Sequence, residues 1–177
     1  DEKTRIVQNV ATYLVKDLFI DPKTGIVNRT KAFAYNMVDY ILQDCHAAHS
    51  LLKIAVHEHY TYTHSVNVAA VGTLFGKNIG LDDDELKNLC SGILMHDVGK
   101  TRISTEILNK NGELTKEEFE IIKKHPELGV EVLKEAGCTM EHEYIITLQH
   151  HENYDGSGYP YGLRKYEIHL CGKIARI

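Results

Sequence analysis

Apolar residues recur at three- and four-residue spacing along almost the whole chain, which is the spacing that lines one face of an α-helix. In the first segment this spacing joins Ile6, Val10, Leu14 and Leu18. No segment of useful length alternates apolar and polar residues, as a half-buried β-strand does. The pattern predicts a single all-α domain, built as a helical bundle without a sheet.

Capping and turn residues divide this pattern into separate helices. Thr115 and Glu118 have the spacing of a capping box, and Pro126 should end the preceding helix at His125 and open the next one. The segment 153–162 contains three glycines and a proline, so it is predicted as a loop. We expect a turn at 21–25 and helices over residues 6–18, 30–45, 51–56, 62–79, 82–97, 115–125, 126–137, 141–152 and 167–177.

The composition disfavours several classes of protein. The chain has 177 residues, 43% of them hydrophobic, which is enough for one domain with its own core. Its formal net charge of −5 disfavours a general nucleic-acid-binding protein, so no DNA partner is expected, while a small anionic substrate bound through a metal stays compatible. No run approaches the ~20 apolar residues that cross a bilayer, and no membrane segment is expected. The four cysteines form no close pair, which favours reduced thiols in a cytoplasmic protein.

Histidine is unusually frequent, with eleven in the chain, and it is the commonest metal ligand in proteins. His96 and Asp97 end a strongly apolar helix, where a buried carboxylate is costly unless it is paired or bound to a metal. His150 and His151 form a second adjacent pair. Neighbouring helical residues point about 100° apart, so we expect these two rings to face different neighbours, as in a site with more than one metal. For each pair the alternative is a solvated helix end.

Taken in order along the chain, these residues resemble a known family. His64, the segment His96–Lys100 (HDVGK), the pair His125-Pro126 and the segment His150–Pro160 (HHENYDGSGYP) are similar to the pattern of the HD-GYP family, a subfamily of the HD metal-dependent phosphohydrolases. Single histidines and a single lysine would carry little weight without this order. The resemblance covers about residues 60–177. It implies a helical bundle of the HD-domain type, with residues 60–177 as the catalytic domain. From the helical pattern, we expect residues 1–59 to form N-terminal helices that pack on, or lead into, this domain.

The resemblance also implies an activity. HD-GYP proteins are cytoplasmic phosphodiesterases that hydrolyse the bacterial second messenger cyclic di-GMP to the linear dinucleotide, and often on to GMP, with iron or manganese. In such a site a hydroxide held between two metals attacks phosphorus, Asp97 would bridge the metals, and Lys100 would neutralise the phosphate oxygens. The implied metal ligands are His64, His96, Asp97, His125, His150 and His151. The loop that is expected to form the wall of the site, and a possible partner surface, contains Asp155, Gly156, Gly158, Tyr159 and Pro160.

Two departures from the family pattern bear on the metals. Tyr60 stands where some members have a glutamate that contributes to a third metal, and Glu58 is expected on another helix face, so we predict two divalent ions. A further aspartate ligand of the family would follow Ile177, where this sequence stops. The sequence also does not begin with Met. We therefore expect a piece of a longer protein that lacks one ligand, binds metal weakly and can be inactive.

Other functions and partners stay open at this point. One alternative is a phosphohydrolase of another cyclic dinucleotide or of a nucleotide, and another is a domain that binds cyclic di-GMP or a partner without hydrolysis. A sensor or receiver domain in the parent chain and a homodimer formed through residues 1–59 are both compatible with the pattern. The six remaining histidines are expected to be ordinary surface or helix-end residues: His46, His49, His57, His59, His142 and His169.

Overall fold

The computed structural model describes residues 2–43 and 60–176 of the chain. Across these ranges the secondary structure is helical, and the only strand-like pairing is an isolated bridge between Asp155 and Arg164, so the predicted all-α class is confirmed. The α-helices are α1 (Glu2–Ile20), α2 (Thr24–Gln43), α4 (Tyr60–Asn78), α5 (Asp83–Met95), α6 (Thr105–Leu108), α7 (Lys116–Ile122), α8 (His125–Glu135), α9 (Glu141–Gln149) and α10 (Leu170–Ala175), and the 3₁₀-helices are η1 (Val98–Arg102) and η2 (Lys165–Glu167). The helix predicted at 51–56 lies outside the described residues, as do Cys45, Glu58, His46, His49, His57 and His59.

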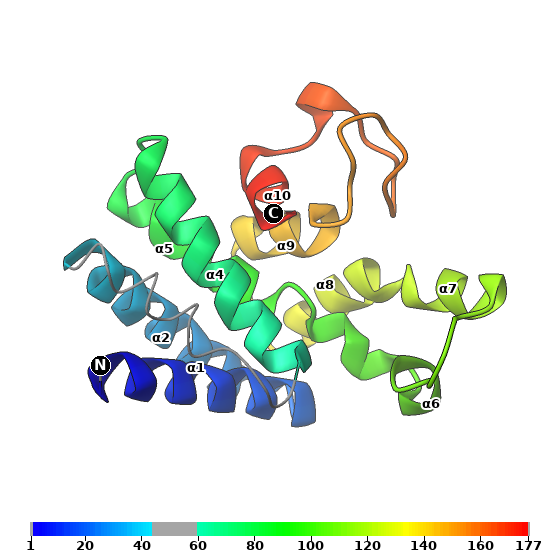
Figure 1. The fold of residues 1–177 in the computed structure, drawn as a ribbon, viewed down its shortest axis with the longest axis horizontal. Coiled ribbons are helices and arrows are strands. Elements are labelled where there is room, and N and C mark those ends of the chain that lie inside the picture. Colours follow the sequence, from blue (N-terminus) through cyan, green and yellow to red (C-terminus); the bar gives the residue numbers. More distant parts are fainter. Residues whose placement is uncertain (1, 44–59, 177) are drawn as a thin grey trace.

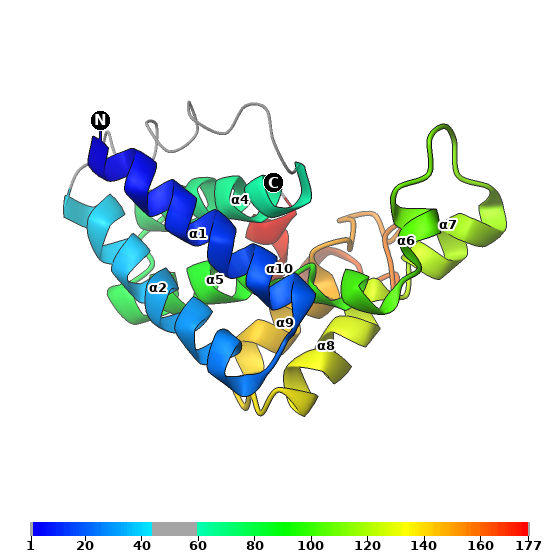
Figure 2. The same ribbon diagram turned by 90° about the horizontal axis from the view of Figure 1, so that it is seen from below.

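The central element of the bundle is α5. Its second half is buried on every side, from Leu89 to Met95, and it packs against α2, α4 and α9. In Figure 1, α1 and α2 run along one edge of the molecule, α9 and α10 lie across from them, and α6, α7 and α8 extend to one side. The view in Figure 2 shows α6 and α7 projecting from the rest of the bundle, next to the end of α1. The residues that follow α5, starting with His96, therefore begin in the middle of the molecule.

Glycines allow the helices around α5 to approach one another closely. A Cβ atom added at Gly99 would lie 1.9 Å from the carbonyl oxygen of His125 and 2.4 Å from the backbone nitrogen of Gly129. A Cβ atom added at Gly92 would lie 2.4 Å from Cδ1 of Ile146. Both distances are shorter than a real Cβ contact, so η1 packs on α8 backbone against backbone, and the backbone of α5 packs against the Ile146 side chain of α9. These contacts bring the ends of α5 and α9 and the start of α8 to one place.

The capping boxes of α5 and α7 are clear in the structure, but several predicted helix boundaries are wrong. Asp82 and Glu85 cap α5, and Thr115 and Glu118 cap α7 as predicted. The second helix begins at Thr24 and not near Thr30, because the carbonyl of Lys23 accepts bonds from the next turn and Val27 packs into the core.

The other boundary differences lie close to the histidines. The helix that was expected to end at His125 ends at Ile122, and His125 begins α8 instead. The helix expected over 141–152 ends at Gln149, so His150 and His151 lie in the turn that follows it. The last helix begins at Leu170 rather than at 167, because the His169 side chain accepts a hydrogen bond from the backbone of Cys171. His169 is thus a helix-end residue, as expected.

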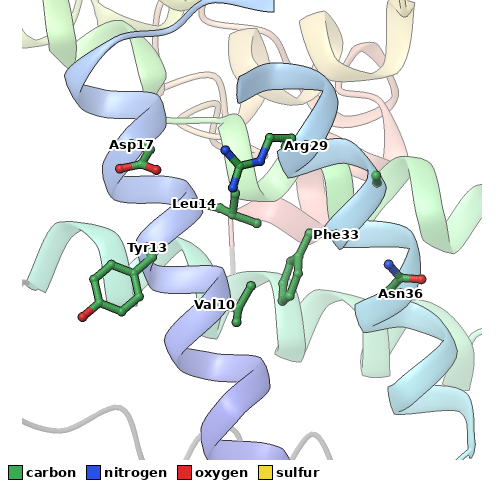
Figure 3. Close-up of a pocket in the computed structure, with 8 residues that line it drawn as sticks. Val10, Tyr13, Leu14, Asp17, Arg29, Phe33 and Asn36 are labelled. Carbon is green, nitrogen blue, oxygen red and sulfur yellow. The ribbon is translucent and has the colours of Figure 1, made fainter. Parts of the chain in front are cut away.

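At the surface, α1 and α2 leave a cavity of about 450 Å³ between them. Figure 3 shows Val10 and Leu14 of α1 and Phe33 of α2 pointing into the space between the two helices, with Asp17 and Arg29 near one end. This cavity contains none of the predicted ligands. None of the helices in the described part of the chain is both long and apolar enough to span a membrane.

Candidate metal centre

The six residues predicted as metal ligands come together at one place, although they lie on four separate parts of the chain. They form two groups, and within each group the candidate ligand atoms all lie within 4.8 Å of one another. The first group consists of Asp97, His125, His150 and His151, and the second of His64, His96 and Asp97. Asp97 belongs to both groups, so its carboxylate lies between two clusters of imidazole nitrogens.

The centre is buried on one side and open on the other. His96, Asp97, His125 and His150 are 0–3% exposed, whereas His151 is half-buried and His64 is exposed. A carboxylate this deep is costly unless charge or hydrogen bonds compensate it. Among the described residues, the open side of the centre is the one that carries His64 and His151.

Backbone carbonyls orient the three buried imidazoles. In each case the Nδ1 atom faces a carbonyl oxygen one helical turn earlier: His96 to Ile93 at 2.6 Å, His125 to Ile122 at 2.8 Å and His150 to Thr147 at 2.8 Å. A carbonyl oxygen only accepts hydrogen bonds, so each Nδ1 atom must carry a proton. In a neutral ring the Nε2 atom then carries a lone pair, and metal-binding histidines are commonly oriented in this way.

These Nε2 atoms converge on the Asp97 carboxylate. His125 Nε2 lies 3.3 Å and His150 Nε2 lies 3.7 Å from Oδ1, and His96 Nε2 lies 3.4 Å from Oδ2. The Nε2 atoms of His125 and His150 are 3.0 Å apart. Oδ1 accepts no hydrogen bond from the described residues. Lone pairs that face a carboxylate at these distances repel one another, and a cation between them removes the repulsion. The donor set therefore fits a metal.

The protonation states agree with this arrangement. Burial is the main reason that the pKa of His150 falls to about 3 and that of His151 to about 2, and the neighbouring imidazoles lower both further. Burial alone would raise the pKa of Asp97, but the histidines around it, His96 first, outweigh burial and hold that pKa well below its usual value. At neutral pH His150 and His151 are thus neutral and Asp97 is ionised, which are the forms that bind metal.

Lys100 is the only positively charged side chain that the described structure places against Asp97. Its Nζ atom lies 2.6 Å from Oδ2 of Asp97, three residues earlier in the chain. The lysine is half-buried and belongs to η1. Lys100 therefore lies next to the centre, and here its ammonium compensates the carboxylate.

Contrary to expectation, His150 and His151 face the same neighbours. Their ring centroids are 4.2 Å apart and both rings belong to the group around Asp97. The expectation of about 100° between adjacent side chains holds inside a helix. It fails here because α9 ends at Gln149 and the backbone turns after it. The turn lets two successive histidines point into one site.

The loop that follows His151 folds back over this histidine. The ring of Tyr159 stacks on the His151 imidazole, and the backbone nitrogen of Tyr159 donates to the carbonyl of His151 at 3.2 Å. A Cβ atom at Gly158 would lie 2.3 Å from the backbone nitrogen of Asn153, so only glycine fits there. Burial raises the pKa of Tyr159 to about 12, and its phenol stays protonated. Tyr159 is the loop residue that touches the candidate centre.

The other predicted loop residues shape the loop. The Asp155 carboxylate accepts bonds from the backbone nitrogen and the hydroxyl of Ser157, at 2.9 Å and 2.6 Å. Gly156 has a φ of 83°, in the left-handed region that favours glycine. Pro160 follows Tyr159 through a cis peptide bond. Asp155 and Gly156 are part of the loop wall and are not among the candidate ligands of the described residues.

A family model described as "HD domain" matches residues 48–177, which is most of the chain. The chain belongs to the HD-domain family.

Relatives of this HD domain include named phosphodiesterases. Cyclic di-GMP phosphodiesterase PA4108 of Pseudomonas aeruginosa is 33% identical over 167 residues, which cover 92% of this chain and 40% of that protein. The 3'3'-cGAMP-specific phosphodiesterase 2 of Vibrio cholerae is 39% identical over 99 residues, which cover 55% of this chain and 19% of that protein. The chain thus spans less than half of the length of these relatives.

The fold is also that of a solved structure. The HDG"Y"P protein Bd1817 from Bdellovibrio bacteriovorus superposes on this HD domain with a TM-score of 0.83 and 22% sequence identity, covering 97% of this chain and 56% of that one. At this identity the likeness concerns the fold. It includes the N-terminal helices, because nearly the whole chain is covered.

One residue of this HD domain was given no role by the sequence analysis. Glu152 is 2% exposed, and its two carboxylate oxygens accept bonds from the backbone nitrogens of Tyr161 and Leu163, at 2.8 Å and 2.9 Å. It ties the far end of the loop to the end of α9, directly after His151. The sequence signal was a lone carboxylate between two histidines and a glycine-rich loop, where backbone N–H groups need acceptors.

Proposed function

We propose that this HD domain is a metal-dependent phosphodiesterase that hydrolyses cyclic di-GMP to the linear dinucleotide and on toward GMP. The observation that carries the proposal is the position of Asp97, which belongs to both ligand groups and whose Oδ1 atom accepts no hydrogen bond from the described residues. A carboxylate that faces two sets of imidazole nitrogens suits two divalent cations with Asp97 between them. Imidazole and carboxylate ligands together suit iron or manganese.

The proposed chemistry divides between the ions and the side chains. Two divalent ions at such a site polarise a phosphate oxygen and lower the pKa of a water molecule, so that it can attack phosphorus at neutral pH. Asp97, together with the imidazoles of His125, His150 and His151, would hold one position, and His64 and His96 would hold the other with Asp97. Lys100 leaves Asp97 when the carboxylate has other cationic partners, and its ammonium then neutralises the phosphate oxygens.

Two parts of the chain support the proposed centre from outside. The loop with Asp155, Gly156, Gly158, Tyr159 and Pro160 forms one wall, and the Tyr159 ring keeps the exposed side of His151 in place. Residues 60–177 are proposed as the catalytic domain, and residues 1–59 as helices that support it. The support for this division is that α1 and α2 share one apolar cluster with α4 and α5.

Cyclic di-GMP is preferred as the substrate because the relative from Pseudomonas aeruginosa, which matches 92% of this chain, carries that activity in its name. A different cyclic dinucleotide is the second candidate, and the cGAMP-specific relative from Vibrio cholerae favours it. Both substrates are second messengers of the bacterial cytoplasm, where we propose that the protein acts. The distinction between them rests on the bases, because the phosphodiester chemistry is the same.

The test is a hydrolysis assay of the full chain with Mn²⁺ or Fe²⁺, run in parallel on cyclic di-GMP, cyclic di-AMP and 3'3'-cGAMP. We expect the linear dinucleotide of guanosine to form fastest, and Asp97→Asn to abolish turnover. Binding of cyclic di-GMP without any product, in a protein that holds its metals, would contradict the proposal and leave a binding domain. Faster turnover of cGAMP would make cGAMP the substrate in place of cyclic di-GMP, and the reaction would still be phosphodiester hydrolysis.

A further inference from the structure

A second cavity, distinct from the one between α1 and α2, lies beside the candidate centre. Its volume is about 430 Å³, within the range of small-molecule sites. The residues that line it are Phe19, Tyr62, Lys100, Thr101, Ile103, Thr105, Leu108, Asn109 and Ile122. They come from the end of α1, the start of α4, η1, α6 and the end of α7, elements that lie near one another in Figures 1 and 2.

Three covalent or hydrogen-bonded links tie this cavity to the centre. Lys100, which lines the cavity, donates to Asp97 at 2.6 Å. Tyr62 lies two residues before His64 on the same helix. The carbonyl of Ile122 accepts the Nδ1 proton of His125 at 2.8 Å. A ligand that fills the cavity therefore lies about the length of one side chain from the candidate metal ligands.

The lining selects a flat, uncharged group. Phe19 and Tyr62 pack edge to face, with ring centroids 5.4 Å apart and planes at 72°. Ile103 is buried, and the remaining aliphatic lining is half-buried. The polar side chains are hydroxyls and one amide, that of Asn109, and Lys100 is the one charged residue among the described residues that line the cavity. An aromatic and aliphatic slot with an amide at an exposed position suits a heterocycle that stacks through its face and hydrogen-bonds through its edge.

We infer that this cavity is the subsite for one nucleobase of the cyclic dinucleotide, with Phe19 and Tyr62 as its stacking platform and Asn109 as the residue that contacts the base edge. The inference rests on the proposed function, because it takes the cyclic dinucleotide as the substrate. In this arrangement the phosphodiester lies over Lys100 and the centre, while the base lies toward α1 and α6. The N-terminal helix α1 then contributes directly to substrate binding through Phe19.

The first experiment locates the base by photo-crosslinking. The full chain is irradiated with 8-azido cyclic di-GMP, and the labelled peptides are identified by mass spectrometry. We expect labels on the peptides that contain Phe19, Tyr62 or Thr105–Asn109, and we expect an excess of unmodified cyclic di-GMP to suppress them. Labels confined to the 153–162 loop, or to the cavity between α1 and α2, would overturn the assignment.

The second experiment measures steady-state kinetics of four variants with cyclic di-GMP. Stacking of a base on an aromatic side chain corresponds to roughly 5- to 150-fold in affinity, so Phe19→Ala and Tyr62→Ala should raise KM by about tenfold or more. Thr105→Trp fills the cavity from an exposed position without removing a packed side chain and should raise KM similarly. Tyr13→Ala is the matched control, because Tyr13 is an exposed aromatic residue of α1 outside this cavity.

The outcomes separate the inference from the proposed function. If wild-type protein turns over cyclic di-GMP and all three cavity variants keep its KM, the base binds elsewhere and the inference is wrong while the function stands. If wild-type protein, loaded with metal, hydrolyses no cyclic dinucleotide, the proposed function fails. In that case crosslinking still reports whether the cavity takes the base. Circular dichroism of each variant shows that a raised KM does not reflect unfolding.

Discussion

The ring of Tyr159 stacks on the imidazole of His151, with centroids 4.5 Å apart and planes 19° apart. His151 is the candidate ligand that follows the end of α9, and it is half-buried, so neither a helix nor the core fixes its ring. The stacked tyrosine and the bond from its backbone nitrogen to the His151 carbonyl do so instead. Groups that orient a ligand in this way commonly affect metal affinity by about 10- to 100-fold.

Tyr159→Ala should therefore weaken metal binding by about tenfold, while Tyr159→Phe, which keeps the ring, should bind metal as the wild type does. Isothermal titration calorimetry of the metal-free protein with Mn²⁺ measures the metal affinity of both variants. Equal affinities of the alanine variant and the wild type would show that the stacking does not position His151.

Metal stoichiometry should follow the two ligand groups. Because Asp97 belongs to both, Asp97→Asn should remove both ions, whereas His64→Ala should leave about one ion on the group of Asp97, His125, His150 and His151. Elemental analysis of the purified full chain, after dialysis against Mn²⁺, gives the counts. Retention of two ions by Asp97→Asn would contradict the shared position of this carboxylate.

The metal-free protein should lose stability as the pH falls below about 6.5. The pKa of His150 is lowered from 6.5 to about 3 in the folded state, so between these values the unfolded chain binds a proton that the folded chain does not. Stability is then present above the unfolded pKa and is lost as the pH falls toward the folded one. From pH 7 to pH 5 this residue alone should cost about 2 kcal/mol. Urea unfolding in EDTA at both values measures the change, and His150→Gln should reduce it.

The contact between η1 and α8 depends on Gly99. A Cβ atom there would meet the carbonyl oxygen of His125 at 1.9 Å, so Gly99→Ala should destabilise the protein by about 3 kcal/mol and move Asp97 away from His125. Gly25→Ala is the control, since Gly25 lies in α2 with nothing within 4 Å of an added Cβ, and it should be neutral or stabilising by up to about 1 kcal/mol. Thermal unfolding measures both, and a Gly99→Ala protein as stable as the wild type would refute the close contact.

Glu152 should hold the loop in place without being a ligand. Glu152→Gln replaces one acceptor by an NH₂ group facing a backbone N–H, which should cost about 1–3 kcal/mol. Hydrogen exchange at the amides of Tyr161 and Leu163 should accelerate, while the exposed control Glu131→Gln leaves it unchanged. Unchanged protection in Glu152→Gln would mean that other contacts hold the loop.

The sequence predicted features that depend on neighbouring residues, but it did not predict the helix boundaries near the candidate centre. The capping box of Thr115 and Glu118 and the helix end at Gly137 are decided by side chains within a few residues, and both occur as predicted. The helix expected to end at His125 ends at Ile122, and this shift decides where the ring points. Here a carbonyl of the preceding turn binds Nδ1, a contact that periodicity does not reveal.

By itself the sequence determined the all-α class, because helical periodicity is local, and its resemblance to the HD-GYP family picked out the six residues that meet at the centre. Only the tertiary structure decided that His150 and His151 share one ligand group with Asp97, and that Glu152 anchors the loop. Asp97 and His125 are separated by 27 intervening residues, and the backbone contact at Gly99 brings them together. Such distances depend on how closely the helices pack. Helix packing in turn depends on many weak contacts across the whole core.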